Sequence, residues 1–191
     1  MQKQLKALTD SLRSAQSRLR RLSDNLSNEE WSKRPGKARW SAAECVEHLN
    51  LTSRAYLALL PDAVARARKR GGPRKKHYRH DALGWFMSMM MGPLRHLGKF
   101  RVLPVKTTPA FVPRRGRSRK EIMADFVRLQ AELAAVIRSG DGLPLDKAKI
   151  VSPFGGRIKY SAYSALVILA RHQHRHIDQA EEAADSSSVP A

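Results

Sequence analysis

Apolar residues near the start of the chain recur at steps of three and four, which places them along one side of an α-helix. The repeat consists of Leu5, Leu8, Leu12, Ala15, Leu19, Leu22 and Leu26. The arginines of this segment fall outside the repeat. This pattern is typical of a helix that packs in a bundle. We therefore expect a helix over residues 5–26 that ends at Ser27 and Asn28.

A second helix has a clear start signal. Ser41 followed by Glu44 forms a capping box, and Trp40 is placed to pack against Cys45 as a hydrophobic staple. The apolar pattern then runs to residue 60. Pro61 should kink or end the regular part of this helix, because proline lacks the backbone N–H that the helix interior needs.

Two further helices follow in the second half of the chain. Ser118 and Glu121 form another capping box before an apolar repeat that ends near Ser139. An irregular stretch around residues 153–156 precedes the last helix, which we expect from near Ser161 to about Ala184. The remaining residues, 185–191, have the composition of a disordered tail.

A long crossover, residues 66–120, connects the second and third of these helices. It begins as a basic linker with glycine and proline, continues as a short apolar helix over residues 83–91, and then becomes coil with several prolines. We expect it to be partly mobile. Outside the loops no segment shows sustained strand alternation. The pattern therefore predicts an all-α four-helix bundle, with residues 1–184 as a single domain.

Composition excludes several classes of protein. The chain has 191 residues, 42% of them hydrophobic and 28% charged, and no apolar run is long enough to span a membrane. Its first residues lack the apolar region of a secretory signal, so we expect a cytoplasmic location. The single cysteine, Cys45, excludes an internal disulfide and a cysteine-rich zinc module.

The positive charge is concentrated in the crossover. The chain has 36 Lys and Arg against 17 Asp and Glu, a net charge of +19. Residues 64–120 hold 17 of these bases and one acid, Asp81, which leaves 19 bases and 16 acids for the other 134 residues. This division indicates a nearly neutral folded body with a basic connector, whereas a uniform excess would indicate a nucleic-acid-binding protein.

Histidines provide the candidate chemistry. His172 and His176 lie four residues apart and share the face of the last helix that carries Leu169, whereas His174 points away. Imidazoles at this spacing can hold one divalent cation. His48 on the second helix can supply a third ligand if the two helices are neighbours, which would leave one coordination position open. Spacing alone does not distinguish this site from ordinary core or surface histidines.

Two neighbouring residues have structural and functional interpretations. Glu44 lies one turn before His48 and could orient a ligand or act as a catalytic base, but its place in the capping box accounts for it without a function. We interpret Cys45 as a small core residue beneath Trp40, because the sequence does not establish a basic partner that would activate its thiol as a nucleophile.

Two motifs resemble those of one family. Residues 40–49 read WSAAECVEHL and residues 172–179 read HQHRHIDQ, and both are similar to stretches of the DinB-like (DinB/YfiT-type) metalloenzyme superfamily, in the same order. The resemblance implies a four-helix bundle, often a homodimer, with nickel, zinc or a similar divalent ion bound by His48, His172 and His176. It further implies a small-molecule substrate, since some relatives are thiol-dependent S-transferases or isomerases and others are thought to be hydrolases.

The hypothesis is therefore a metal-dependent enzyme that activates water or a low-molecular-weight thiol. The alternative is a non-enzymatic protein that binds nucleic acid or an anionic surface through the basic crossover. The apolar run from Trp85 to Met91 allows three interpretations. It could lie on an anionic membrane, cover the metal site as a lid, or simply cover the core, which is the interpretation that we favour.

Overall fold

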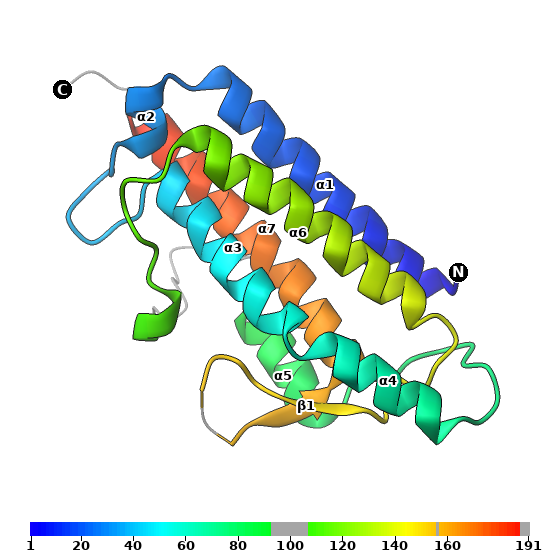
Figure 1. The fold of residues 1–191 in the computed structure, drawn as a ribbon. Coiled ribbons are helices and arrows are strands. Elements are labelled where there is room, and N and C mark those ends of the chain that lie inside the picture. The colour runs from blue at the N-terminus through cyan, green and yellow to red at the C-terminus, as the bar shows by residue number, and fades with distance from the viewer. Residues whose placement is uncertain (93–106, 156, 188–191) are drawn as a thin grey trace.

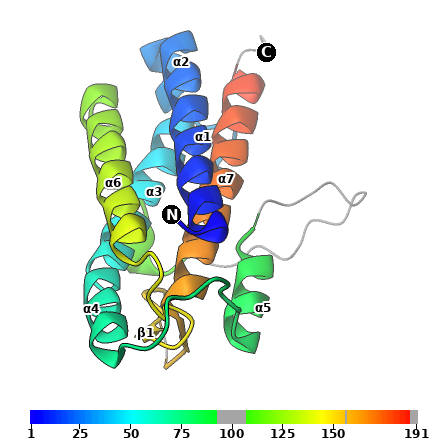
Figure 2. The ribbon, with the colours of Figure 1, turned by 90° about the vertical axis from the view of Figure 1, so that its right-hand side faces the viewer.

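Four long helices form the body of the protein (Figure 1). The computed structural model describes residues 1–92, 107–155 and 157–187. Within them, α1 (Lys3–Asn25) and α3 (Ala42–Leu57) each pack against both α6 (Arg119–Ser139) and α7 (Ala162–Ser187). Figure 2 shows these helices running side by side along the molecule. The predicted all-α fold is confirmed.

The apolar repeat of α1 faces the interior, as its spacing predicts. Its first five members are buried, and Leu22 and Leu26 are half-buried against the apolar cluster that contains Ala15 and Leu19. Beside the repeat, Arg18 pairs with Asp178 at 2.7 Å and with Glu181 on α7. The arginine thus joins two helices at the surface while the leucines fill the space between them.

Capping boxes mark three helix starts. The predicted boxes of α3, Ser41 with Glu44, and of α6, Ser118 with Glu121, are both present. A third box, Ser27 with Glu30, begins α2 (Asn28–Ser32), a short helix that the sequence analysis did not predict. Ser27 therefore starts a helix directly after the first one ends.

The crossover contains more helix than expected. α3 ends at Leu57, and α4 (Leu60–Arg70) follows with Pro61 in its first turn, so the predicted break near Pro61 occurs. The first basic residues of the crossover, expected to form a linker, belong to α4 and are helical. The predicted short apolar helix is α5 (Ala82–Met90), and a 3-10 turn, η1, spans Pro109–Phe111. The stretch 93–106, which holds much of the coil expected to be mobile, lies outside the described residues.

A small hairpin replaces part of the stretch expected to be irregular. β1 (Lys149–Val151) pairs antiparallel with β2 (Lys159–Ser161), and the opposed Ile150 and Tyr160 are both buried. α7 continues to Ser187, three residues past its expected end, and residues 188–191 lie outside the description. In the part of the chain that the structure describes, no helix has the length and apolar character of a membrane span.

Candidate metal centre

Three histidines from α3 and α7 converge in the interior of the bundle. His48, His172 and His176 are only 3%, 4% and 8% exposed, and one ring nitrogen of each lies within 4.8 Å of the others. The Nε2 atoms of His48 and His172 are 3.1 Å apart. His174 instead faces α1, where its Nε2 lies 3.0 Å from the Ser11 hydroxyl. The structure thus brings together the three histidines chosen from spacing and motif, and turns the fourth away.

A backbone carbonyl fixes the orientation of His48. Its Nδ1 lies 2.7 Å from the carbonyl oxygen of Phe111 in η1. Because a carbonyl only accepts hydrogen bonds, Nδ1 must carry the proton, and the lone pair of the neutral ring is on Nε2, the nitrogen that faces His172. A histidine held in this way by its other nitrogen is typical of metal ligands.

The environment keeps the three rings neutral. Burial lowers the pKa of His48, and it lowers the pKa of His172 and of His176 well below the usual value, with the neighbouring histidines and Arg175 adding to the effect. Neutral imidazole is the form that binds a metal ion. The buried Nδ1 atoms of His172 and His176 also have no hydrogen-bond partner among the described residues. This donor set therefore fits a divalent ion that accepts nitrogen ligands.

Aromatic side chains surround the three rings. The ring centroid of Trp40 lies 4.9 Å from that of His48 and 5.9 Å from that of His176, and the Phe154 ring lies 5.7 Å from His172. Phe154 also contacts Phe111. These rings come from three segments outside the four bundle helices, and they give the buried histidines an apolar lining. The sequence pattern predicts only a staple role for Trp40, and it contains no signal for the two phenylalanines.

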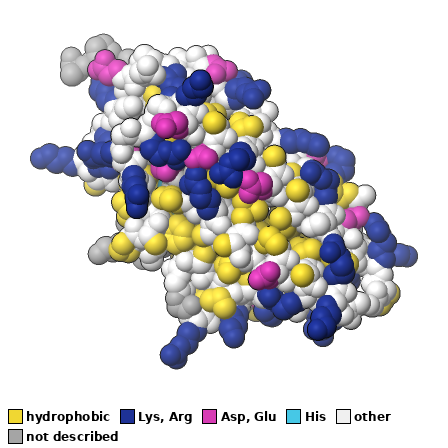
Figure 3. Space-filling view, in the orientation of Figure 1, with side chains coloured by type: hydrophobic (Ala, Val, Ile, Leu, Met, Phe, Trp, Pro, Cys, Tyr) yellow, Lys and Arg dark blue, Asp and Glu magenta, His cyan; other side chains and the backbone are white. Residues whose placement is uncertain are grey.

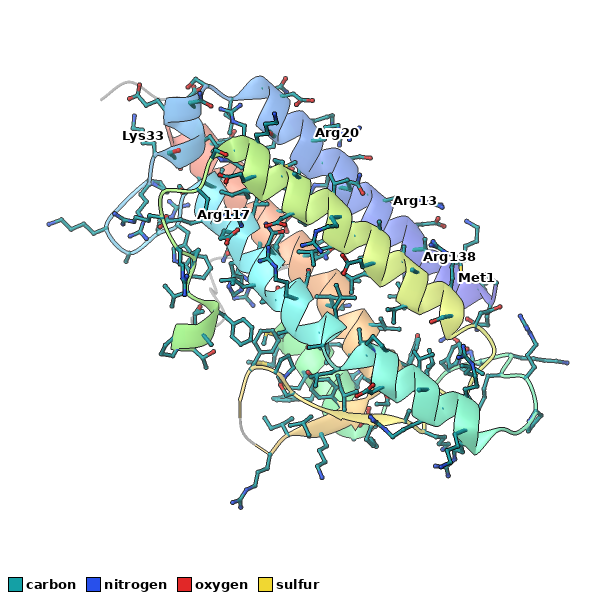
Figure 4. The ribbon with its side chains drawn as sticks, viewed as in Figure 1. Met1, Arg13, Arg20, Lys33, Arg117 and Arg138 are labelled. Carbon is teal, nitrogen blue, oxygen red and sulfur yellow. The ribbon has the colours of Figure 1, made fainter. Side chains whose placement is uncertain are left out.

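The two carboxylates beside His48 along α3 both bind arginines. Arg117, two residues before α6 (Figure 4), binds Glu47 at 2.9 Å and Asp125 at 2.7 Å. Glu44 accepts hydrogen bonds from Arg34 and Arg115. Neither carboxylate belongs to the cluster of possible metal ligands, which in the described part of the chain consists of histidines alone.

The family model described as the DinB superfamily matches residues 11–180 of the chain. The chain belongs to the DinB superfamily. Both motifs that suggested this family, and all three converging histidines, fall within the matched residues. Neither the curated proteins nor the solved structures compared with this DinB-superfamily chain contain a match.

The structure assigns Glu44 of this DinB chain a capping role. Its carboxylate receives hydrogen bonds from the backbone N–H of Ser41 at 3.0 Å and from Nε of Arg34 at 2.6 Å. The two arginines and the cap occupy both of its oxygens. The capping interpretation is therefore confirmed, whereas a role as catalytic base stays a prediction.

Cys45 is a core residue, as expected. Its side chain is buried in the apolar cluster against which Trp40 packs. Burial, assisted by the charge of Glu44, raises the pKa of its thiol to about 12. A thiol with so high a pKa is not a nucleophile near neutral pH.

Proposed function

We propose that this protein is a divalent-metal-dependent enzyme in which His48, His172 and His176 hold the ion. The observation that carries the proposal is the convergence of three buried, neutral imidazoles. Three protein ligands leave one position of a four-coordinate ion for substrate or water, as in catalytic rather than structural sites. Imidazole ligands suit nickel and zinc among the common divalent metals.

The residues of the site favour a small nucleophile with a negative charge. When bound, such an ion supplies Lewis acidity, which lowers the pKa of a water or thiol ligand toward neutrality. No carboxylate of the described chain joins the three histidines, so the protein itself leaves the charge of a divalent cation uncompensated. Hydroxide or the thiolate of a low-molecular-weight thiol would compensate it. We therefore propose hydrolase or thiol S-transferase chemistry on a small molecule.

The lining serves the same chemistry. The Phe111 carbonyl holds His48 in one tautomer, and Trp40 and Phe154 keep bulk water from the rings. Exclusion of water strengthens every electrostatic interaction inside a site.

Following the resemblance to the family, we also propose that the protein is a cytoplasmic homodimer.

Metal content tests the proposal. We expect the purified wild-type protein to bind about one divalent ion per chain, and His48→Ala and His172→Ala to lose most of it, because two imidazoles make a weak site. Elemental analysis after dialysis against nickel or zinc measures the bound ion. His174→Ala, which removes a histidine that faces α1, is the matched control and should keep the metal.

Circular dichroism of the same samples establishes that the variants are folded. If folded His48→Ala and His172→Ala bind as much metal as the wild type and His174→Ala, the proposed site is wrong.

A further inference from the structure

The short helix α5 has its faces reversed relative to a normal surface helix. Its small residues Gly84 and Ser88 are buried against the body. Its large apolar residues point outward, and the exposed fractions are 40% for Leu83, 55% for Trp85, 53% for Phe86 and 56% for Met89. The interpretation of this run as a cover for the core is therefore wrong for its largest side chains, although Met87 and Met91 do pack on the core.

Backbone contacts fix this orientation. A Cβ atom on Gly84 would lie 2.3 Å from Ser164 on α7, so only glycine allows this approach. At the other end of α5, Arg171 donates to the carbonyl of Ser88 at 2.8 Å and Arg175 donates to that of Met90 at 2.9 Å. The helix is thus attached to α7 through its small residues and its carbonyl groups, and its large apolar side chains are exposed. Figure 2 shows α5 at the edge of the molecule, beside α7.

The surroundings of α5 are basic. Arg79 lies just before the helix, Lys149 and Lys159 lie on the adjacent hairpin, Arg171 lies at its C-terminal end, and all four are exposed. The segment that leads into α5, residues 71–80, contains four Lys and Arg and no acid, and two of these bases pair with acids elsewhere in the chain. Asp81, at the start of α5, is bound by Lys149 at 2.7 Å. Basic side chains also outnumber acidic ones on the face in Figure 3, which looks away from α5, so the positive charge is not confined to the surroundings of this helix.

We propose that the exposed face of α5, formed by Leu83, Trp85, Phe86 and Met89, docks on the surface of an anionic lipid bilayer. An apolar face that carries tryptophan and is flanked by bases is typical of helices that lie in a membrane interface. With nine residues, α5 is too short to cross a bilayer. A second copy docked through its own α5 would bring the bases beside both helices together, and nucleic acid offers no apolar phase for Leu83 and Met89.

Vesicle co-sedimentation tests this surface. We expect the wild-type protein to sediment with vesicles of phosphatidylcholine and phosphatidylglycerol, and to stay in solution with phosphatidylcholine alone or at high salt. Joint substitution of Trp85→Ser and Phe86→Ser should weaken binding at least about tenfold, because two aromatic side chains no longer enter the interface. Val112→Ser, which removes a valine exposed in the segment after η1, is the control and should bind like the wild type.

Two results would overturn the proposal: failure of the wild type to bind anionic vesicles, and equal vesicle binding by the double variant and the wild type. In the second case, loss of a dimer by the double variant in sedimentation velocity would identify a second copy as the occupant, and loss of duplex DNA binding would identify nucleic acid. Because the substituted side chains are exposed, circular dichroism should show the wild-type fold in every variant.

Discussion

Replacement of Asp81 by alanine should lower the free energy of unfolding by about 3 kcal/mol, since it leaves several buried donors without an acceptor. The Asp81 carboxylate accepts hydrogen bonds from the Ser164 hydroxyl at 2.8 Å, from the hydroxyl and backbone N–H of Ser161, and from Lys149 at 2.7 Å. One side chain thus joins the start of α5, the first turn of α7 and the strand β1. Urea denaturation at neutral pH measures the effect.

The contribution of Asp81 should also depend on pH. Burial opposes ionisation of the carboxyl, but hydrogen bonds from Lys149, Ser164 and Ser161 outweigh it and lower its pKa to about 2. In the unfolded chain this pKa is about 3.9. Because the folded value is the lower one, the stabilisation of about 2 kcal/mol is fully present above the unfolded pKa and is lost as the pH falls through about 2.

The matched control is Asp24→Ala, which removes an exposed carboxylate near the end of α1. A surface substitution of this kind should change stability by less than about 0.5 kcal/mol. Equal destabilisation by Asp81→Ala and Asp24→Ala, or the same loss of stability in acid for Asp81→Ala and the wild type, would contradict the role assigned to Asp81.

The bundle helices could be predicted because their signals are local. The leucine repeat of α1 and the capping boxes at Ser41 and Ser118 each involve residues within a few turns of one another. The same holds for the pair His172 and His176, whose common direction follows from helical geometry alone. His48 needed one further assumption, that α3 and α7 are neighbours, which the structure confirms.

The features that the sequence did not reveal depend on distant contacts. The hydrogen bond to His48 comes from the carbonyl of Phe111, a group that every residue type carries, so no side chain marks it. The strands β1 and β2 have three residues each, too few to show an alternation.

The outward direction of the apolar residues of α5 has the same kind of cause. This direction depends on the close approach of Gly84 to Ser164, whereas the hydrophobicity of the segment alone indicates a buried helix.

Asp81 was conspicuous in the sequence as the single acid of the crossover, but its partners lie about 70 to 80 residues further along the chain.

Substitution of Glu44 offers the second large effect and tests whether its carboxylate only caps α3 or also belongs to the metal centre. Glu44→Ala should lower the free energy of unfolding by about 2–3 kcal/mol, because it removes a helix cap and leaves Arg34 without its carboxylate partner. Metal binding should not change, since the carboxylate is not part of the histidine cluster. Denaturation and elemental analysis of the same sample measure both quantities.

Glu121→Ala is the matched control, because Glu121 occupies the equivalent place in the capping box of α6. Among the described residues, its carboxylate accepts hydrogen bonds only from Ser118, and its side chain is exposed. Loss of this cap should cost about 1 kcal/mol, so the excess for Glu44→Ala measures the arginine contacts. If Glu44→Ala instead keeps its stability but loses metal, Glu44 belongs to the metal centre, and the account of the site must include a carboxylate.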